Sequence, residues 1–544
     1  MRKIILTATV LFAASGVGLR AQENESLSRR IEVTRQYVPE VEGARKIDYA
    51  PRMSDTVTLK PYIDYAITPT PWKSVFGTQP IEPVAISTAR YEPNLPFYLR
   101  AGAGYPLTST ANLRASFGNP RARHFGIYAD HDGLWQHLID NSAPAGHTEN
   151  RLGFNGGFAA GRRTFDYDLH YDLNAYQWNG LISNNFNYFN NFSAAICFGD
   201  SFADLSRFNY RIGIEGGLWG NSLQSLTHSG GVDATAGFAW PVGRGAILLD
   251  GGFNGGWSSG VADQLISVAP HYRIKLADLT LNVGAKLYFN DYRFDTNRGN
   301  TVYALPDISI AYAVLPSFEP YITIDGSVAN GTYKDLYALN PYVAPLTAGV
   351  RSKNVSLQGG FRGSARDLLV YDLHAGHMVA DAPCFIRSIE RGSFTPIQVP
   401  LNVTYASANI GFHLPAGFGF IAGVQYNSYD NEANLWRGAS TTPAPLGMGI
   451  PSLHLSGTVT YDYRNKLFTK LRADFVGKRY MADMQDFYTE IPSYVDLSLS
   501  VEYKFSNRFS MFLQGDNLLN QTIIHYLGYQ DYGIRGMIGF IVVF

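Results

Sequence analysis

Apolar and polar residues alternate along the segment from Ser493 to Phe505. From Val495 onward, its odd positions carry Val, Leu, Tyr or Phe, and its even positions carry Asp, Ser, Glu or Lys. Successive side chains of a β-strand point to opposite faces, so this period of two gives one apolar face and one polar face. Such a strand suits a wall between hydrocarbon and water, and it is typical of a membrane β-barrel.

The same alternation recurs far upstream, with turn signals between the runs. The runs begin at about Pro96 and include Phe97–Tyr105, Leu113–Phe117, Phe165–Leu173, Phe208–Ile214, Leu279–Phe289 and Leu453–Tyr463. Backbone groups in lipid must be paired within the protein, so a set of spanning strands has to close on itself. We therefore predict an all-β fold, a transmembrane antiparallel up-and-down β-barrel over residues 95–544 with about 16 to 22 strands.

Composition is consistent with this fold and narrows the partners. The 35 Tyr, 33 Phe and 54 Gly fit aromatic girdles and close backbone packing, although a large soluble β-protein shares such a composition. A β-propeller or β-helix should repeat at a fixed period, and the sequence shows no such period. The 44 basic and 45 acidic residues nearly balance, which argues against nucleic acid as a partner.

The N-terminal residues have the order of an export signal. Arg2 and Lys3 precede an apolar run from Ile4, and small residues lead to Ala21. We predict a signal peptide over residues 1–21 that is cleaved after Ala21. From residue 22 to 94 prolines recur; because proline lacks a donor and fixes φ, we expect an extended periplasmic or lumenal arm.

The chain ends on Phe540, Val542 and Phe544, which alternate up to the terminal residue. This ending resembles the insertion signal of bacterial outer-membrane β-barrels, whose last strand normally ends in Phe or Trp. The resemblance implies a Gram-negative outer-membrane location, with lipid and the barrel insertion machinery as partners.

The C-terminal quarter resembles the closing strands of TonB-dependent outer-membrane receptors. The resemblance is carried by Phe475–Tyr480, by Ile491–Ser498 and by Asp516–Gln521, the last being similar to a conserved turn of that family. It implies an outer-membrane barrel that takes up a ligand. The plug of such receptors needs well over a hundred residues, and only Lys60–Pro96 is available, so the plug should be missing or vestigial. The cleavage site at Ala21-Gln22 and the arm segment Val33–Val41 also resemble plugless receptor-type barrels of Bacteroidetes.

Within the arm, Asp55, Thr56, Val57, Thr58 and Leu59 resemble the energy-coupling box of this family. Such a box adds as a strand to a periplasmic energy-coupling protein, which would then be a partner together with other envelope proteins. The alternative is an ordinary edge strand or a first barrel strand that runs on to Ile67.

Three short motifs contain residues typical of catalytic or metal sites. Asp130-His131-Asp132 suggests an acid/base cluster, but the following Gly133 and Leu134 predict a solvated loop tip. His374 and His377 would lie on opposite faces of a strand, which disfavours a metal site. The Gly-x-Ser-x-Gly match at Gly256–Gly260 lacks a strand-to-helix turn and predicts a glycine-rich turn. We therefore expect neither an enzyme nor a cofactor.

The polar face of the strands should line the lumen. Charged residues of both signs on different strands are candidates for this lining: Arg114, Asp166, Asp168, Asp172, Arg211 and Lys286. Mixed charge favours a wet channel or a lumen filled by the arm, without a clear ion preference. Cys197 and Cys384 fit small buried or lipid-facing residues, and a disulfide between them stays open because its geometry cannot be seen in sequence.

Three functions remain open at this point. The first is a receptor-like barrel that takes up or passes a ligand. The second is a non-transporting subunit of an outer-membrane complex, with a structural or biogenesis role, which docks through its arm and through the loops at Trp135–Asn150 and Asp430–Pro451. The third and most remote is a barrel hydrolase.

Overall fold

The computed structural model describes residues 96–544 except for fourteen stretches: 120–121, 139–140, 178–185, 223–226, 259–260, 295–296, 316, 332, 344–349, 382, 391–392, 415–416, 431–448 and 483–487. The predicted signal peptide, the proline-rich arm and the box at Asp55–Leu59 lie outside the described residues. No helix in the described part of the chain is long and apolar enough to cross a membrane.

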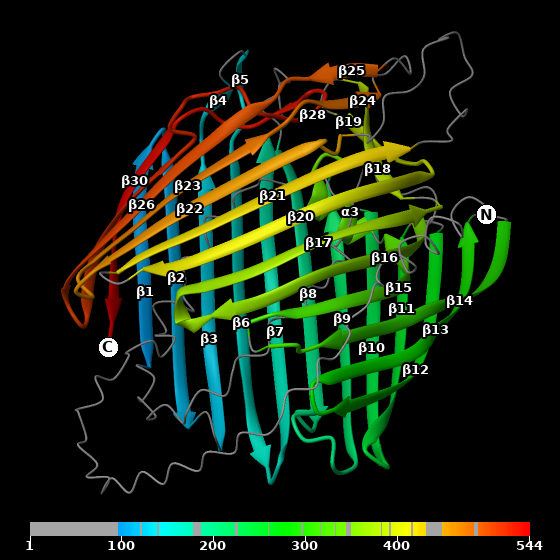
Figure 1. The fold of residues 1–544 in the computed structure, drawn as a ribbon. Coiled ribbons are helices and arrows are strands. Elements are labelled where there is room, and N and C mark those ends of the chain that lie inside the picture. The colour runs from blue at the N-terminus through cyan, green and yellow to red at the C-terminus, as the bar shows by residue number, and fades with distance from the viewer. Residues whose placement is uncertain are drawn as a thin grey trace, which may run out of the picture. The chain divides into compact units, whose positions relative to one another are not determined.

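Within the described residues, 22 strands form one closed antiparallel sheet (Figure 1). The first eleven are β1 Phe97–Tyr105, β2 Thr108–Asn119, β3 Arg123–Leu134, β6 His147–Ala160, β7 Arg163–Gln177, β8 Phe186–Gly199, β9 Asn209–Asn221, β10 Thr227–Val242, β11 Gly245–Ser258, β12 Val261–Leu276 and β13 Leu279–Phe294. The others are β14 Asn297–Tyr312, β15 Glu319–Gly331, β16 Val350–Ala365, β17 Leu369–Ala380, β20 Leu401–Leu414, β21 Phe418–Asp430, β22 Leu453–Tyr463, β23 Leu467–Val476, β26 Tyr494–Ser506, β27 Phe509–Asp516 and β30 Arg535–Val543. The predicted all-β barrel is confirmed, at the upper end of the expected strand number.

The two ends of the barrel differ in their connections. At one end the strands are joined by tight turns, such as that at Gly161, whose φ of 66° suits a residue without a Cβ. At the other end the connections are long and carry additional elements: β4 His137–Leu138, β5 Asn141–Pro144, α3 Tyr333–Leu339, β18 Cys384–Glu390, β19 Ser393–Gln398, β24 Arg479–Ala482, β25 Tyr488–Ile491, β28 Ile524–Tyr526 and β29 Tyr529–Gln530. Outer-membrane barrels have short periplasmic turns and long extracellular loops, which orients the chain. A 3₁₀ turn at Arg366–Leu368 lies at the short-turn end.

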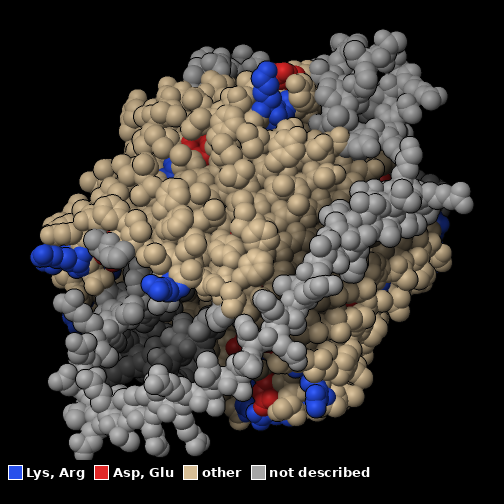
Figure 2. Space-filling view, in the orientation of Figure 1, with Lys and Arg blue, Asp and Glu red and all other residues tan. Residues whose placement is uncertain are grey.

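The outer face of the wall is apolar. On β7, Leu169, Tyr171 and Leu173 are all exposed, at 40 to 45% of their surface, and they alternate with polar residues. In Figure 2, Lys, Arg, Asp and Glu are sparse over the middle of the face in view and gather nearer its margins. Apolar side chains exposed in this pattern on a closed barrel are stable in lipid, so the wall spans a membrane.

The barrel closes where its first and last strands pair. The β1–β30 ladder runs from Tyr98 opposite Val543 to Tyr105 opposite Gly536, and Figure 1 shows red β30 beside blue β1. Phe97 and Phe544 extend this joint with two backbone hydrogen bonds of 2.9 and 3.0 Å and with rings stacked 4.5 Å apart.

The predicted insertion signal lies in this last strand and just after it. Phe540 and Phe544 are exposed on the outer side of the wall, and Val542 shares their alternation. Their recognition by the insertion machinery stays a prediction.

Two predicted turns are strand in the structure. β3 continues to Leu134, so Asp130–Asp132 do not lie at a loop tip. β11 continues to Ser258, so the glycine-rich segment is strand at least that far. Glycine favours turns in sequence, but Gly133 and Gly256 occupy ladder positions opposite Ser109 and Gly231 in the structure.

Candidate ligand pathway

The polar side chains of the wall lie on the face opposite its exposed apolar side chains, and most of the charged ones are paired. Asp172 on β7 binds Arg151 on β6 at 2.6 Å and accepts a hydrogen bond from the Asn191 amide at 2.8 Å. Asp168 accepts a hydrogen bond from the Tyr128 hydroxyl at 2.9 Å. The inner wall is therefore lined by a network of ion pairs and hydrogen bonds.

The other candidates for the lumen have partners on the adjacent strand or on the next strand but one. Arg114 binds Asp130 at 2.7 Å, Lys286 binds Asp325 at 2.5 Å, and Arg211 lies 3.7 Å from Asp166. Pairing across strands leaves little net charge at any of these points. The part that these residues play in ligand passage stays a prediction.

A polar pocket of about 160 Å³ lies in the long-loop half of this inner wall. Its lining includes Arg100 on β1, Glu149 on β6 and Gln514 on β27, together with Arg151 and Asp172. Arg100 is 7% exposed; it donates to the Gln514 side chain at 3.2 Å and lies 4.0 Å from the ring centre of Phe512. The pocket presents donors and acceptors of both signs to a small polar molecule.

Sequence reasoning missed most of the pocket. Arg100 lies at a polar position of the alternating run Phe97–Tyr105. That alternation alone could have placed its side chain on the inner face of the wall. Gln514 and Glu149 reach the same pocket only because β27, β30, β1 and β6 come together through closure of the barrel, and the alternation within one strand carries no information about such neighbours.

Packed loops cover the long-loop end. We call the following buried apolar residues the outer cap: Phe189, Trp219, Leu336, Tyr337, Tyr342, Val343, Ile386, Phe394, Met481, Ile491 and Tyr526. They come from β8, β9, the α3 connection and the hairpins β18–β19, β24–β25 and β28–β29, which Figure 1 shows together at this end. Phe394 is fully buried, and the rings of Phe189 and Tyr337 stack at 3.7 Å. The outer cap is thus a small hydrophobic core across the rim.

Buried polar groups fix the underside of the cap. The His525 ring lies 3.2 Å from the Asp531 carboxylate, and His147 contacts the Tyr532 hydroxyl at 2.8 Å. Burial alone would raise the pKa of the Asp531 carboxyl, but the hydrogen bond and charge of His525 and the charge of Arg535 lower it below its ordinary value. Asp531 is therefore held as a carboxylate within the loops.

The catalytic candidates on β3, Asp130, His131 and Asp132, all border the polar pocket, but their side chains lie on different faces of the strand. Asp130 and Asp132 lie on one face of β3, whereas His131 lies on the other, between Ser109 at 2.9 Å and Asn150 at 2.7 Å. On β17, His374 binds Asp372 at 2.7 Å and His377 contacts Thr404 at 2.9 Å.

Ser258 of the serine motif and Cys197 both have hydrogen-bond partners within the wall. The Ser258 hydroxyl accepts a hydrogen bond from Ser229 at 2.8 Å, within the β10–β11 wall. Cys197 is a free, half-buried cysteine whose sulfur accepts a hydrogen bond from Arg211 at 3.0 Å. Among the residues that the structure describes, no cluster of three or more His, Cys, Asp or Glu is placed to hold a metal ion.

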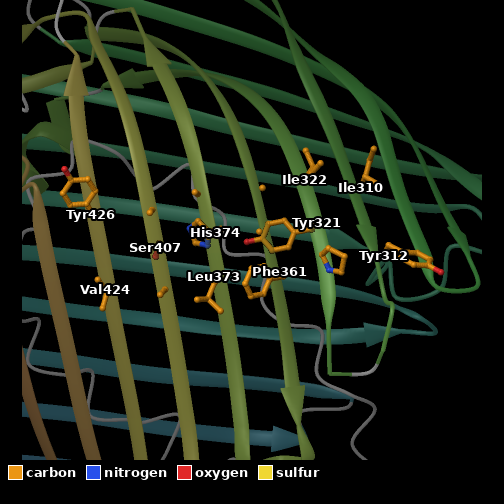
Figure 3. A pocket seen from close by; sticks show the side chains of 16 residues that line it. Ile310, Tyr312, Tyr321, Ile322, Phe361, Leu373, His374, Ser407, Val424 and Tyr426 are labelled. Carbon is orange, nitrogen blue, oxygen red and sulfur yellow. The ribbon is translucent and has the colours of Figure 1, made fainter. Parts of the chain in front are cut away.

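A second hollow lies in the wall between β14 and β21. This groove has a volume of about 850 Å³, and most of its lining is apolar. Figure 3 shows Ile310 and Ile322 at one side and Val424 and Tyr426 at the other, with Leu373 between them. Ile310, Ile322, Val424 and Tyr426 are exposed on the outer face, so the groove opens toward lipid.

Comparisons with known proteins agree with this geometry. No protein-family model and no curated sequence matches the chain. Solved structures do match: the copper transporter OprC at 12% identity and a TM-score of 0.63, over 84% of this chain and 81% of that one. The siderophore receptor PirA from Acinetobacter baumannii matches at 11% identity and a TM-score of 0.61, over 84% of this chain and 81% of that one. The ferripyoverdine receptor of the outer membrane of Pseudomonas aeruginosa matches at 12% identity and a TM-score of 0.61, over 84% of this chain and 73% of that one.

The chain has the fold of an outer-membrane receptor barrel. The resemblance to TonB-dependent receptors is thereby confirmed at the level of the fold. The closed barrel, its lipid-facing apolar surface and this shared fold make the protein an integral outer-membrane protein.

Proposed function

We propose that the protein carries a ligand across the outer membrane through the lumen of its barrel. The observation that carries this proposal is the inner wall, where paired charges of both signs line a polar pocket in the long-loop half and recur elsewhere along the wall. A wet lumen of balanced charge admits polar solutes without a strong ion preference. The fold shared with a siderophore receptor and a copper transporter supports uptake as the direction of passage.

We further propose that passage is energised through Asp55–Leu59, paired as an added strand with a periplasmic energy-coupling protein. A substitution of Val57 by proline removes a backbone donor from the middle of this segment. We expect V57P to lose chemical crosslinking to the C-terminal domain of that protein, whereas V84P, in the same arm but outside the box, should keep it. Equal crosslinking of both variants would remove the energy-coupling proposal and leave passive passage.

Conductance in planar bilayers tests passage itself. The currents of the full chain and of a chain that lacks residues 22–94 are compared in potassium chloride. Residues 22–94 are deleted because the predicted arm could fill the lumen. We expect steady current from at least the shortened chain. Absence of current from both would contradict passage, and recovery of other envelope proteins with such a barrel in gentle detergent would favour the non-transporting subunit.

A further inference from the structure

The wall is weakly joined at one place, between β14 and β15. Their ladder covers five residue pairs, from Asp307 opposite Asp325 to Ala311 opposite Tyr321, all in the short-turn half. By contrast, the β13–β14 ladder runs the whole length of both strands, from Leu279 to Phe294. The short ladder stops beside Pro306, which has no amide hydrogen to donate.

Beyond this ladder, the strands overlap. Ile322 on β15 and Leu357 on β16 are more than half exposed, so continued alternation would also expose Val328 and Val355 to lipid. Instead, Val328 is 7% exposed, and both valines pack with a cluster that includes Leu305, on the inner face of β14. The long-loop halves of β15 and β16 therefore lie against the inside of the preceding strands.

Gly326 makes this overlap possible. A Cβ built on Gly326 would lie 2.5 Å from the Cβ of Leu305, closer than real Cβ atoms approach. In an ordinary ladder these two residues would point to opposite faces of the sheet. Their contact shows that the strands are stacked at this level rather than joined edge to edge.

Side chains of β16 latch the overlap across three strands. Arg351 binds the Asp263 carboxylate on β12 through two nitrogens, at 2.5 and 3.2 Å, and lies 4.3 Å from the ring centre of Tyr292 on β13. Lys353 lies 5.7 Å from the ring centre of Tyr303 on β14. These contacts join β16 to β12, β13 and β14, and they are the polar counterpart of the cluster around Leu305.

The lipid-facing groove adjoins the same joint. Ile310 and Ile322, which line one side of the groove, belong to the five-pair ladder itself. Small residues such as Gly359, Ala375 and Ala406, on β16, β17 and β20, line the middle of the groove, so that a long unbranched chain could lie flat across the strands. An opening at the overlap would lead directly to this surface.

We propose that the β14–β15 overlap is a lateral portal, closed by the Arg351–Asp263 latch, through which a molecule with a polar head and a hydrocarbon chain moves between lumen and lipid. The apolar cluster at Leu305 and Val328 accommodates the chain, and the charged inner wall accommodates the head. The portal rests on the proposed function in one respect, because it requires that a ligand reaches the lumen. It further predicts that this ligand is amphipathic.

The test uses a photoreactive benzoylphenylalanine in place of Tyr303, which lies at the overlap, in vesicles of phosphatidylethanolamine and phosphatidylglycerol. D263N breaks the latch, and D291N, which breaks the exposed pair with Arg298 near the same rim, is the matched control. We expect lipid adducts at position 303 to rise about tenfold in D263N, because a half-buried ion pair is lost, and to stay unchanged in D291N.

A second photoreactive position separates the portal from general loosening. Tyr405 is an inner-face tyrosine on β20, whose ladder with β21 runs from Asn402 to Leu414. Adducts at position 405 as frequent as at position 303, or none at 303 in folded D263N, would overturn the portal. Heat-modified mobility in gels confirms folding of every variant. If lipid adducts form at position 303 but the barrel conducts no current in planar bilayers, the portal would be supported and passage along the barrel axis would be contradicted.

Discussion

The joint between β1 and β30 and the joint between β14 and β15 are opposites. The first unites the two ends of the barrel sequence over eight residue pairs and adds the stacked rings of Phe97 and Phe544. The second unites strands adjacent in sequence, yet its ladder covers five pairs. Closeness in sequence therefore does not set the strength of a joint. Local chemistry does, through a proline without a donor and a glycine that permits overlap.

The outer cap connects these two joints. The α3 connection follows β15, and the β28–β29 hairpin precedes β30. Tyr342, from the first, and Tyr529, from the second, have ring centres 5.6 Å apart. The loops next to the two joints therefore contact each other within the cap.

The largest effect is expected from loosening the cap. Phe394 is fully buried, so Phe394→Ala should destabilise the outer cap by about 3 to 5 kcal/mol through lost burial and a residual cavity. Hydrogen exchange should rise in α3 and β28 while the barrel strands stay protected. Phe420→Ala, which removes a lipid-facing ring from β21, is the control. Native exchange rates in the F394A cap would show that the loops are held in another way.

A smaller effect is expected at the overlap. Gly326→Ala places a methyl group against Leu305 and should destabilise the overlap by about 1 to 3 kcal/mol. The same change at Gly359 meets no atom closer than 3.8 Å and should be nearly neutral. Exchange of the β15 amides distinguishes the two variants. Equal protection in both would mean that β14 and β15 are not stacked at this level.

The closing joint should respond less in stability. Phe544→Ala removes the stack on Phe97, worth about 0.5 to 1.5 kcal/mol beyond its burial. Urea unfolding in vesicles measures this loss, and the yield of assembled barrel in cells measures the predicted insertion signal. Phe192→Ala removes a lipid-facing ring in mid-chain and serves as the control. A normal yield of F544A would reject the terminal ring as part of the signal.

The smallest effect is a response of the cap to acid. Because the pKa of Asp531 is lowered in the folded protein by His525 and Arg535, despite its burial, the carboxylate stabilises the cap above its unfolded pKa of about 3.9. This stability is lost as pH falls through the folded pKa. The hydrogen-exchange protection factors of the β28 amides, which correct for the slower intrinsic exchange in acid, should therefore fall on acidification, and they should fall less in Asp531→Asn. An identical acid response in both proteins would assign the effect to other groups.

The alternation of side chains allowed much of the wall to be predicted. The run Phe97–Tyr105 coincides with β1, because one face of that strand meets lipid and the other does not. The run from Leu279 was expected to end at Phe289, whereas β13 continues to Phe294. Strands rise beyond the hydrocarbon into water, where the apolar face is no longer required and the period fades.

Contacts between elements could not be predicted in the same way. The charge of Arg114 and its place in a strand were visible, but its partner Asp130 depends on the β2–β3 register. The outer cap assembles from loops whose sequences have no periodicity, so the contact between Phe394 and Tyr526 could not be predicted from the sequence. In the sequence, Pro306 and Gly326 are ordinary interruptions of the alternating pattern. Only the position of the neighbouring strand shows that Pro306 lies where the β14–β15 ladder ends and that Gly326 permits the overlap.

The pairing of β1 with β30 also has a consequence for biogenesis. The partner of β1 is β30, which lies more than four hundred residues further along the chain and is therefore synthesised and exported much later. Until it arrives, the growing sheet has two free edges, each with a row of unpaired backbone groups able to join another chain. The cell must therefore keep more than four hundred residues from aggregating in the periplasm before the wall can be completed, and a truncation at the C-terminus would expose both edges permanently.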